Sequence, residues 1–245
     1  MPVGDPGGTV APAEDELGRP DVPYTGEVTP GGPSDVRELP DVVIRKASVS
    51  SMDNNVYLLT DRATGEQLLV DAADDAPRVL ALVAEGMPDG GTRLATVVTT
   101  HQHWDHHRAL AEVLRATGAR SAAGREDGPH LPVAPDVLLD HGDTVPLGAL
   151  TLDVIHLRGH TPGSVALVLR SSDGSTHVFT GDSLFPRGVG NTDKDSRRFS
   201  QLIDDVEERL FGVLPDDTWV YPGHGKDTTI EAERPHLAEW RKRGW

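Results

Sequence analysis

Residues 94–106 read Leu-Ala-Thr-Val-Val-Thr-Thr-His-Gln-His-Trp-Asp-His, an apolar strand pattern that runs directly into a dense set of metal-ligating side chains. His101, His103, Asp105 and His106 all belong to residue types that commonly bind divalent transition metals. Residues two apart in an extended segment point to the same side, so His101 and His103 can converge on one ion. Asp105 and His106 lie where the chain turns toward a helical pattern and can face a second ion. The stretch therefore predicts a metal site at the end of a strand.

Three later turns, each directly after a strand pattern and each containing glycine, carry further candidate ligands. They are Gly159-His160-Thr161, Thr180-Gly181-Asp182 and Gly223-His224. Glycine allows a tight turn and a close approach of a side chain to an ion. With the first stretch they complete a set of five histidines and two aspartates, enough for two ions with room for water. A structural zinc site is closed by four ligands, often cysteines, so seven nitrogen and oxygen ligands favour an open, catalytic site.

The composition argues against several other classes of protein. The chain has 245 residues, no cysteine and a formal net charge of −16 at pH 7. Without cysteine there is no disulfide, no thiolate ligand and no cysteine nucleophile. The acidic balance argues against nucleic acid as a partner, because phosphate backbones are bound by Lys and Arg. No segment approaches the roughly 20 apolar residues of a membrane helix, and the first residues lack a signal-peptide pattern, so we expect a cytoplasmic protein.

Strand and helix patterns alternate along most of the chain. Strands are expected at residues 41–48, 55–60, 67–70, 94–100, 137–139, 150–156, 164–169, 177–180 and 219–221. Helices are expected at residues 77–85, 107–117, 199–210 and 230–243, a mixture that favours sheets covered by helices. Residues 1–35, rich in Pro, Gly and acids, predict a flexible tail, which leaves residues 36–245 as one folded domain. Within the first stretch, Trp104 is expected to pack beneath its loop.

The order and spacing of these motifs resemble the metallo-β-lactamase superfamily and, among its branches, the glyoxalase II-type hydrolases. The resemblance covers about residues 40–245 and rests on His101-x-His103-x-Asp105-His106, Gly159-His160-Thr161, Gly181-Asp182 and Gly223-His224. It implies an α+β fold, the αββα sandwich, with the metal site at the edge of the sheets.

The resemblance also implies a role for each candidate ligand. The first ion would be bound by His101, His103 and His160, and the second ion by Asp105, His106 and His224. Asp182 would bridge the two ions, and Asp71, at the end of an early strand, would orient a ligating imidazole. Two ions that share a hydroxide lower its pKa toward neutrality, and Asp105 can orient that hydroxide as well as bind metal. We therefore assign Asp105 and Asp182 to catalysis.

The loop after Asp182 departs from the glyoxalase II pattern. In that family a Gly-Cys-Gly is followed by Lys and Tyr residues that hold glutathione, whereas here the loop reads Arg187-Gly188-Val189-Gly190-Asn191-Thr192. The family's longer C-terminal helical region, which adds basic residues for the glutathione carboxylates, is matched here only by residues 230–243. Thioester hydrolysis is still expected, without an assigned thiol carrier. Arg187 and Asn191 are the candidates for substrate contact.

We therefore expect a hydrolase with two divalent ions, Zn²⁺ in the first place, that uses a metal-bound hydroxide on a thioester, lactone or related ester. The alternative is a mononuclear iron persulfide dioxygenase of the same superfamily, a branch that uses only the first-site histidines and Asp182 as a triad. A metal-binding module without turnover is disfavoured by the open site. A phosphodiesterase acting on RNA is disfavoured by the acidic balance. The expected partner is a small-molecule substrate, and the oligomeric state is not predicted.

Overall fold

The sheet that carries the His-rich stretch has seven strands in sequential order, and the computed structural model describes residues 23–87 and 93–244. Its strands are β1 (Asp35–Glu38), β2 (Val42–Val49), β3 (Asn54–Asp61), β4 (Gln67–Val70), β5 (Leu94–Thr99), β6 (Arg120–Gly124) and β7 (Val137–Leu139). The strands β1 to β4 pair antiparallel through tight turns, and β4 to β7 pair parallel. The helices α1 (Ala76–Glu85) and α2 (Leu110–Thr117) supply the crossovers from β4 to β5 and from β5 to β6.

The second sheet has six strands in the order β15-β14-β11-β10-β9-β8. They are β8 (Thr144–Leu147), β9 (Leu150–His156), β10 (Val165–Arg170), β11 (Thr176–Gly181), β14 (Trp219–Pro222) and β15 (Thr228–Thr229). Only β11 and β14 pair parallel, and the chain between them forms the small β12 (Leu184–Phe185) and β13 (Gly188–Val189) ladder and α3 (Ser196–Val206). The chain ends in α4 (Ile230–Glu233) and α5 (Leu237–Arg243).

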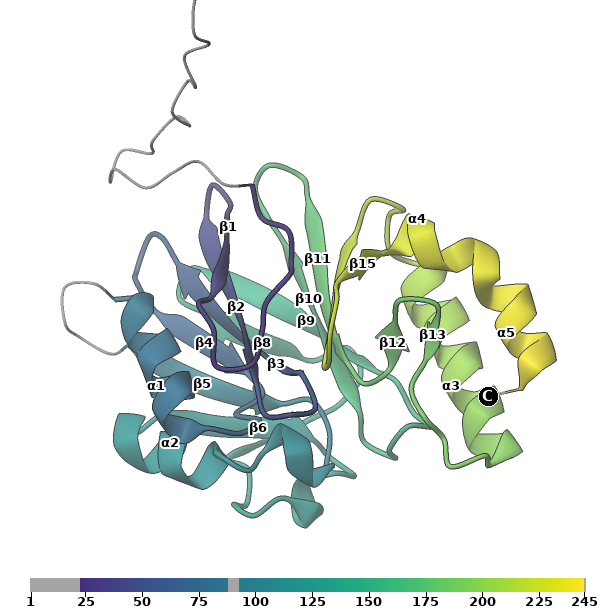
Figure 1. The fold of residues 1–245 in the computed structure, drawn as a ribbon, viewed down its shortest axis with the longest axis horizontal. Coiled ribbons are helices and arrows are strands. Elements are labelled where there is room, and N and C mark those ends of the chain that lie inside the picture. Colours follow the sequence, from purple (N-terminus) through teal and green to yellow (C-terminus); the bar gives the residue numbers. More distant parts are fainter. Residues whose placement is uncertain (1–22, 88–92, 245) are drawn as a thin grey trace, which may run out of the picture.

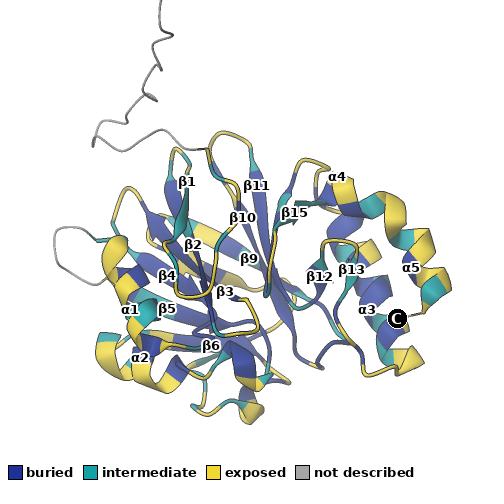
Figure 2. Ribbon diagram, in the orientation of Figure 1, coloured by how far each residue is buried: buried dark blue, intermediate teal, exposed yellow. Residues whose placement is uncertain are grey.

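Three apolar clusters hold these elements in four layers (Figure 1). Strand residues alternate between the two faces of each sheet. On β3, Tyr57 and Leu59 meet the second sheet, whereas Val56 and Leu58 pack against α1 and α2. On the second sheet, alternate residues of β10 pack against α3 and α5, whose outer faces are exposed (Figure 2). The expected αββα sandwich is therefore confirmed.

Several elements differ from the sequence-based expectations. The strands β1, β6 and β8 were not expected; β6 reads Arg-Ser-Ala-Ala-Gly and lacks the β-branched and aromatic residues that indicate strands. The expected helix at 199–210 begins at Ser196, because Asp195 caps it by accepting bonds from two backbone amides, and it closes in a π-helical turn. The expected helix at 230–243 is interrupted by a 3₁₀ turn at Arg234–His236, where Pro235 removes a backbone donor.

The chain before β1 lies against the folded body from residue 23 onward. Tyr24 donates a hydrogen bond of 2.6 Å to Asp227, and the amide of Gly31 donates one of 3.0 Å to the carbonyl of Ser48. The expected flexible tail at residues 1–35 falls, for residues 1–22, outside the described residues. Residues 23–35 are placed because the body offers them hydrogen-bond partners, which composition alone does not reveal.

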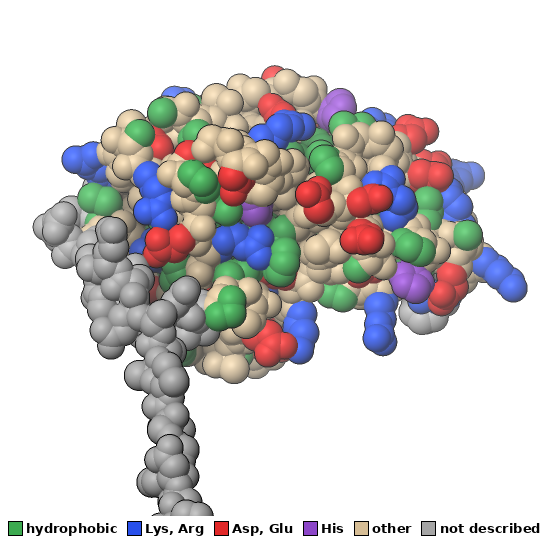
Figure 3. Space-filling model, turned by 90° about the horizontal axis from the view of Figure 1, so that it is seen from above, with side chains coloured by type: hydrophobic (Ala, Val, Ile, Leu, Met, Phe, Trp, Pro, Cys, Tyr) green, Lys and Arg blue, Asp and Glu red, His purple; other side chains and the backbone are tan. Residues whose placement is uncertain are grey.

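The surface of the described residues is mixed in charge. On the face seen in Figure 3, acidic and basic side chains are interspersed with hydrophobic ones. Within residues 23–87 and 93–244, no helix has the length and hydropathy needed to cross a membrane.

Candidate metal centre

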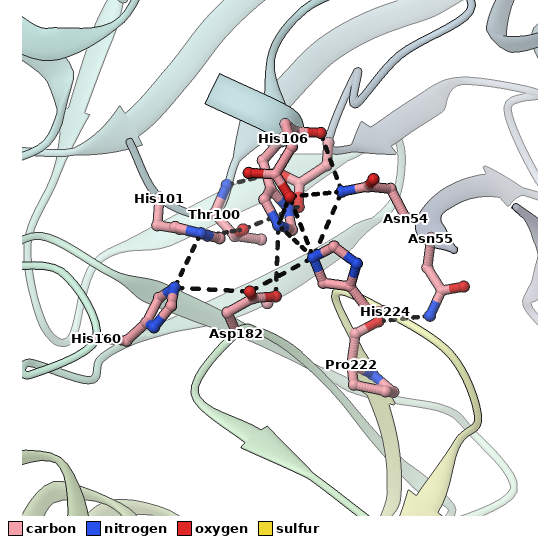
Figure 4. Close-up of polar contacts among 12 residues, drawn as sticks. Asn54, Asn55, Thr100, His101, His106, His160, Asp182, Pro222 and His224 are labelled. Carbon is pink, nitrogen blue, oxygen red and sulfur yellow. Dashed lines mark hydrogen bonds and ion pairs between the residues drawn. The ribbon is translucent and has the colours of Figure 1, made fainter. Parts of the chain in front are cut away.

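The candidate ligands come from four loops that meet at one edge of the sandwich. The first loop follows β5 and contains the 3₁₀ turn Trp104–His106, and the second joins β9 to β10 and carries His160. The third follows β11 and carries Asp182, and the fourth follows β14 and carries His224. Because β11 and β14 are parallel neighbours, their carboxyl ends bring Asp182 and His224 to the same edge. Figure 4 shows the imidazoles of His101, His106, His160 and His224 gathered around Asp182.

All seven candidate ligands fall within one cluster. Three trios have their ligand atoms within 4.8 Å of one another: His101 with His103 and His160; His101 with His106 and Asp182; and Asp105 with His106 and His224. The first and third trios are the sets expected for the first and second ions, and Asp182 lies between them. Which ion each side chain holds stays a prediction.

The spacing of the imidazole nitrogens is that of side chains that share a metal ion. His106 Nε2 lies 3.1 Å from His224 Nε2, and His101 Nε2 lies 3.3 Å from His160 Nε2. Two nitrogens that each lie 2.0–2.1 Å from a tetrahedral zinc ion are separated by about 3.3 Å. Side chains that share an ion would therefore be spaced as these pairs are.

The Asp182 carboxylate supplies a second indication of a metal. Among the described residues, its Oδ1 is a buried oxygen without a hydrogen-bond partner, which is costly unless a cation compensates. Oδ1 lies 3.4 Å from His106 Nε2, and Oδ2 lies 3.5 Å from His224 Nε2 and 3.6 Å from His160 Nε2. Oδ1 therefore faces His106, and Oδ2 lies between His224 and His160, so the carboxylate stands between the two sets of candidate ligands.

Backbone and carboxylate oxygens fix the tautomers of three imidazoles. The Nδ1 atoms of His106, His160 and His224 donate to Asp71 Oδ2 at 2.8 Å, to the carbonyl of Asn191 at 2.7 Å and to the carbonyl of Met52 at 2.8 Å, respectively. Each donation leaves Nε2 directed at the cluster. His101 is held similarly, because its Nδ1 lies 3.0 Å from the hydroxyl of Thr100.

Asp71 lies where the sequence places an orienting carboxylate. Besides the hydrogen bond from His106, Asp71 accepts hydrogen bonds from the backbone amide and the hydroxyl of Thr100, both at 2.8 Å. Its backbone is left-handed, with φ of 59° directly after β4, which turns the side chain beneath the His-rich loop. Asp71 thus fixes His106 directly and His101 through Thr100.

Two supporting residues were missed by the sequence analysis. The buried Asn54 donates from Nδ2 to the carbonyl and to Oδ2 of Asp105, both at 3.0 Å. The buried Asp127 accepts from the amides of Gln102 and Gly163 and from the hydroxyl of Thr161, so it ties the first loop to the loop of His160. A lone Asn before a strand and a lone Asp after one carry no spacing signal that could have revealed these roles.

In the metal-free chain, the surroundings lower the pKa of two candidate ligands and raise the pKa of two others. Burial and the neighbouring imidazoles hold the pKa of His101 and of His160 below the usual range, so both are neutral and able to bind metal. Burial opposes protonation of His106 and His224, but Asp182, with Asp71 or Asp105, outweighs it and raises the pKa of each to about 10. An ion bound by these two imidazoles must therefore displace protons.

A pocket of about 840 Å³ adjoins the cluster. Its walls come from the loop between Phe185 and Lys194 and from the end of α5, with Arg187, Lys194 and Arg243 as basic residues. Both expected substrate contacts, Arg187 and Asn191, line this pocket. Because the Asn191 carbonyl also accepts from His160 Nδ1, the loop that lines the pocket contacts a candidate ligand directly.

Trp104 is placed differently from the expectation. Its side chain is half exposed rather than packed beneath the loop, and the Arg108 guanidinium stacks 3.7 Å from the ring centroid. The 3₁₀ turn at Trp104–His106 explains the difference, since it turns Asp105 and His106 inward and Trp104 outward.

Comparisons with known proteins agree on one protein family. The model of the metallo-beta-lactamase superfamily matches residues 52–224, a span that contains all seven candidate ligands. A hydroxyacylglutathione hydrolase of Fuscovulum blasticum is 38% identical over 174 residues, which are 70% of this chain and 62% of that protein. The match thus spans less than two thirds of that relative's length.

Relatives with a different activity are about as similar. The human mitochondrial persulfide dioxygenase ETHE1 is 35% identical over 185 residues, covering 73% of this chain and 68% of that protein. The crystal structure of ETHE1 from Myxococcus xanthus aligns with a TM-score of 0.68 at 34% identity, covering 79% of this chain and 82% of that one.

Proposed function

Because the chain belongs to the metallo-beta-lactamase superfamily of metal-dependent enzymes, we propose that it is a hydrolase that cleaves a thioester, or a related ester or lactone, of a small molecule. The observation that carries the proposal is the completeness of the ligand set expected for the second ion. Asp105, His106 and His224 converge as closely as His101, His103 and His160 do. A mononuclear site needs only one set of ligands, so the presence of both sets favours two ions over one.

The donor set favours zinc at both positions. Five imidazoles and two carboxylates, with no thiolate, are ligands that zinc accepts in catalytic sites. When bound, two divalent ions lower the pKa of a shared water and polarise a carbonyl group. Hydrolysis would add one water to the thioester and release a carboxylic acid and a thiol.

The protein's own residues would orient and admit the reactants. Asn54 holds the Asp105 carboxylate in one orientation, so Asp105 can accept a hydrogen bond from the attacking water as well as bind metal. The side chains of Asp182 and His224 are 13% and 21% exposed, which leaves the cluster open to solvent on one side. Asp105 and Asp182 are thus the residues to which we assign catalysis.

The adjoining pocket would hold the leaving group. Arg187, Lys194 and Arg243 give it a positive lining, whereas Phe185 and Val189 contribute apolar surface. A small acyl-thiol with one or more carboxylate or phosphate groups fits this combination. We assign the catalytic domain to residues 36–245, with the pocket formed by its C-terminal half.

A persulfide dioxygenase with one iron ion is the second candidate, favoured by the 35% identity to human ETHE1. Its metal would be held by two of the first-site histidines and Asp182, a His-His-carboxylate set with open positions, which suits ferrous iron.

An assay of both reactions on one preparation tests the proposal. The protein is stripped of metal, reloaded with Zn²⁺ or Fe²⁺, and offered hydroxyacyl thioesters in one series and a low-molecular-weight persulfide with oxygen in the other. Released thiol can be followed with a thiol reagent, because the chain has no cysteine of its own. We expect thiol release by the zinc form that Asp105→Ala abolishes and that Arg115→Ala, an exposed substitution on α2, leaves unchanged. Oxygen consumption by the iron form, with no hydrolysis by either form, would overturn the proposal.

A further inference from the structure

A fully buried lysine lies beside the loop that carries His224. The Lys46 side chain on β2 is 0% exposed, and its Nζ donates to the carbonyls of Gly26 and Gly225, at 2.8 and 2.7 Å, and to Asp227 Oδ1, at 2.6 Å. A buried ammonium group is costly unless it is paired and fully hydrogen-bonded. Here all three of its protons have acceptors. Two of those acceptors belong to the loop that contains His224, and the third belongs to the N-terminal segment.

The partner carboxylate ties the same segments together. Asp227 Oδ2 accepts from the Tyr24 hydroxyl at 2.6 Å and from the Trp219 indole at 2.9 Å. The Arg37 guanidinium covers this contact, 4.4 Å from the ring centroid of Tyr24 and 3.8 Å from that of Trp219. Segments from the two ends of the chain are thereby joined around one ion pair (Figure 1).

Gly26 shows how closely the N-terminal segment is fitted to this ion pair. A Cβ at Gly26 would lie 2.4 Å from Asp227 Oδ2, and the residue has a φ of +72°. Asp35 holds the turn by accepting bonds from the amides of Thr25 and Gly26, at 2.9 and 2.8 Å. The segment therefore closes over the ion pair with no room for a side chain.

The ion pair is connected to His224 through one residue, Gly225. The Gly225 carbonyl, one residue beyond His224, accepts from Lys46 Nζ and also from Asn55 Nδ2, the latter at 3.0 Å. The Gly225 amide donates to the carbonyl of Asp53 at 3.1 Å, and the amide of Asn55 donates to the carbonyl of Gly223 at 2.8 Å. Figure 4 shows Asn55 beside Pro222 in the strand end that leads to His224.

We propose that Lys46 and Asp227, closed over by Tyr24 and Gly26, form a clamp that positions His224, so that loading of the second metal ion depends on the N-terminal segment. Lys46 is a positioning residue in this account, because it acts through Gly225 and touches no candidate ligand. The inference rests on the proposed dinuclear site. It predicts that loosening the clamp weakens the binding of the second metal ion and leaves the binding of the first unchanged.

Metal titration of full-length variants tests the clamp. Lys46→Met keeps the length of the side chain but removes its charge, and Tyr24→Phe removes a single hydroxyl. Leu82→Ala on α1 serves as a destabilised control, since Leu82 is buried in the cluster between α1 and the first sheet. We expect Lys46→Met to bind the first zinc ion as the wild type does and the second at least 10-fold more weakly. Tyr24→Phe should also weaken binding of the second ion, but by a smaller factor. Leu82→Ala should bind both ions normally.

Two titration results would overturn the proposal that the clamp positions His224. One is normal binding of both ions by Lys46→Met and Tyr24→Phe. The other is a loss of both ions that simply follows the loss of thermal stability, as judged against Leu82→Ala.

Hydrogen exchange in the metal-free chain separates the clamp from the proposed function. In Lys46→Met and Tyr24→Phe, the amides of Gly223 and Gly225 should exchange at least 10-fold faster, while residues 101–106 keep their protection. If the wild type binds only one ion, the dinuclear hydrolase fails, and exchange at these two amides still decides whether the clamp holds the loop. Unchanged exchange in both variants would reject it.

Discussion

The Asp71 carboxylate accepts a hydrogen bond from His106 Nδ1 at 2.8 Å, and the same oxygen accepts the hydroxyl of Thr100, also at 2.8 Å. Thr100 in turn lies 3.0 Å from His101 Nδ1. One buried carboxylate therefore sets the orientation of one imidazole from each predicted metal position. Its influence on metal binding follows from this double connection.

Asp71→Asn tests that connection. The amide keeps the shape of the side chain, but it replaces one acceptor oxygen by a donor and removes the charge that supports His106. Loss of such an outer partner typically lowers metal affinity 10–100-fold, and we expect both ions to be affected. Competition with a chromophoric chelator measures this. An Asp71→Asn chain that binds zinc like the wild type would show that Asp71 does not orient the ligands.

Gly223→Ala should disrupt the candidate centre by direct collision. A Cβ at Gly223 would lie 2.2 Å from Asp182 Oδ1 and 2.7 Å from His106 Cε1, so at least one of these ligands must move. We expect metal affinity to fall at least 100-fold and unfolding free energy to fall by about 1–3 kcal/mol, the usual range for overpacking. Calorimetric zinc titration and urea unfolding report the two quantities.

Gly225→Asn is the matched control for that substitution. Gly225 lies in the same loop with a φ of +66° and open space where a Cβ would point, and asparagine tolerates this conformation. It should retain both ions. Equal losses in the two variants would assign the effect to the loop as a whole and not to the collision with Asp182.

Asn54→Ala should lower turnover through Asp105. The substitution removes both hydrogen bonds to Asp105 and leaves a buried carbonyl without its donor, at a cost of about 1–3 kcal/mol. Because Asp105 would then be free to rotate, we expect kcat to fall about 10-fold or more while zinc stoichiometry changes little. A variant with normal kcat would show that Asn54 does not support turnover through Asp105.

The pocket predicts a preference for charged substrates. Arg187→Gln and Arg243→Gln keep much of the side-chain length and remove the positive charge next to the leaving group. Charge-assisted hydrogen bonds are worth about 1.5–3 kcal/mol, so KM for a thioester with a carboxylated thiol should rise about 10-fold or more in each variant. An uncharged thioester of similar size is the control, and its KM should not change. Equal effects on both substrates would argue against anion recognition.

Asp205 predicts a pH-dependent contribution to stability. Burial works against its ionisation, but hydrogen bonds from Arg158 at 2.6–2.9 Å and the charge of Arg209 outweigh burial and hold the pKa of Asp205 below its usual range. A carboxyl group with a lowered folded pKa stabilises the fold fully above its unfolded pKa of about 3.9 and loses that contribution as pH falls through the folded value. Asp205→Asn should therefore cost about 1–3 kcal/mol at pH 7 and progressively less below pH 4. Urea unfolding of the metal-free chains at several pH values measures the difference, and a cost independent of pH would contradict this assignment.

The ligands of the candidate site were predictable because they follow strands at short, regular spacing. His101, His103, Asp105 and His106 identify themselves within one stretch, and glycine marks the loops of the other three. The strands that carry them were predictable too, since apolar and β-branched residues recur along each of them. The strand β6 was missed because packing between its neighbours, and not its own composition, makes it a strand.

The support around the ligands was not predictable, because it depends on contacts between distant parts of the chain. Asn54 and Asp105 are separated by 51 residues, and Lys46 and Asp227 by 181. Neither pair has a local pattern: Asn54 and Asp105 meet at the end of the first sheet, and Lys46 on the first sheet meets Asp227, directly before β15 of the second. Residues 23–35 likewise have the composition of a tail and become ordered through partners elsewhere in the chain.

The most direct test of the dinuclear hydrolase is the metal content per chain of protein purified without added metal or chelator. It is measured for the wild type, His106→Ala and His224→Ala. We predict about two zinc ions per chain in the wild type and about one in each variant, because both substitutions remove a ligand from the set expected for the second ion. About one iron ion per chain, retained in both variants, would contradict the account and favour oxygen chemistry at the first site.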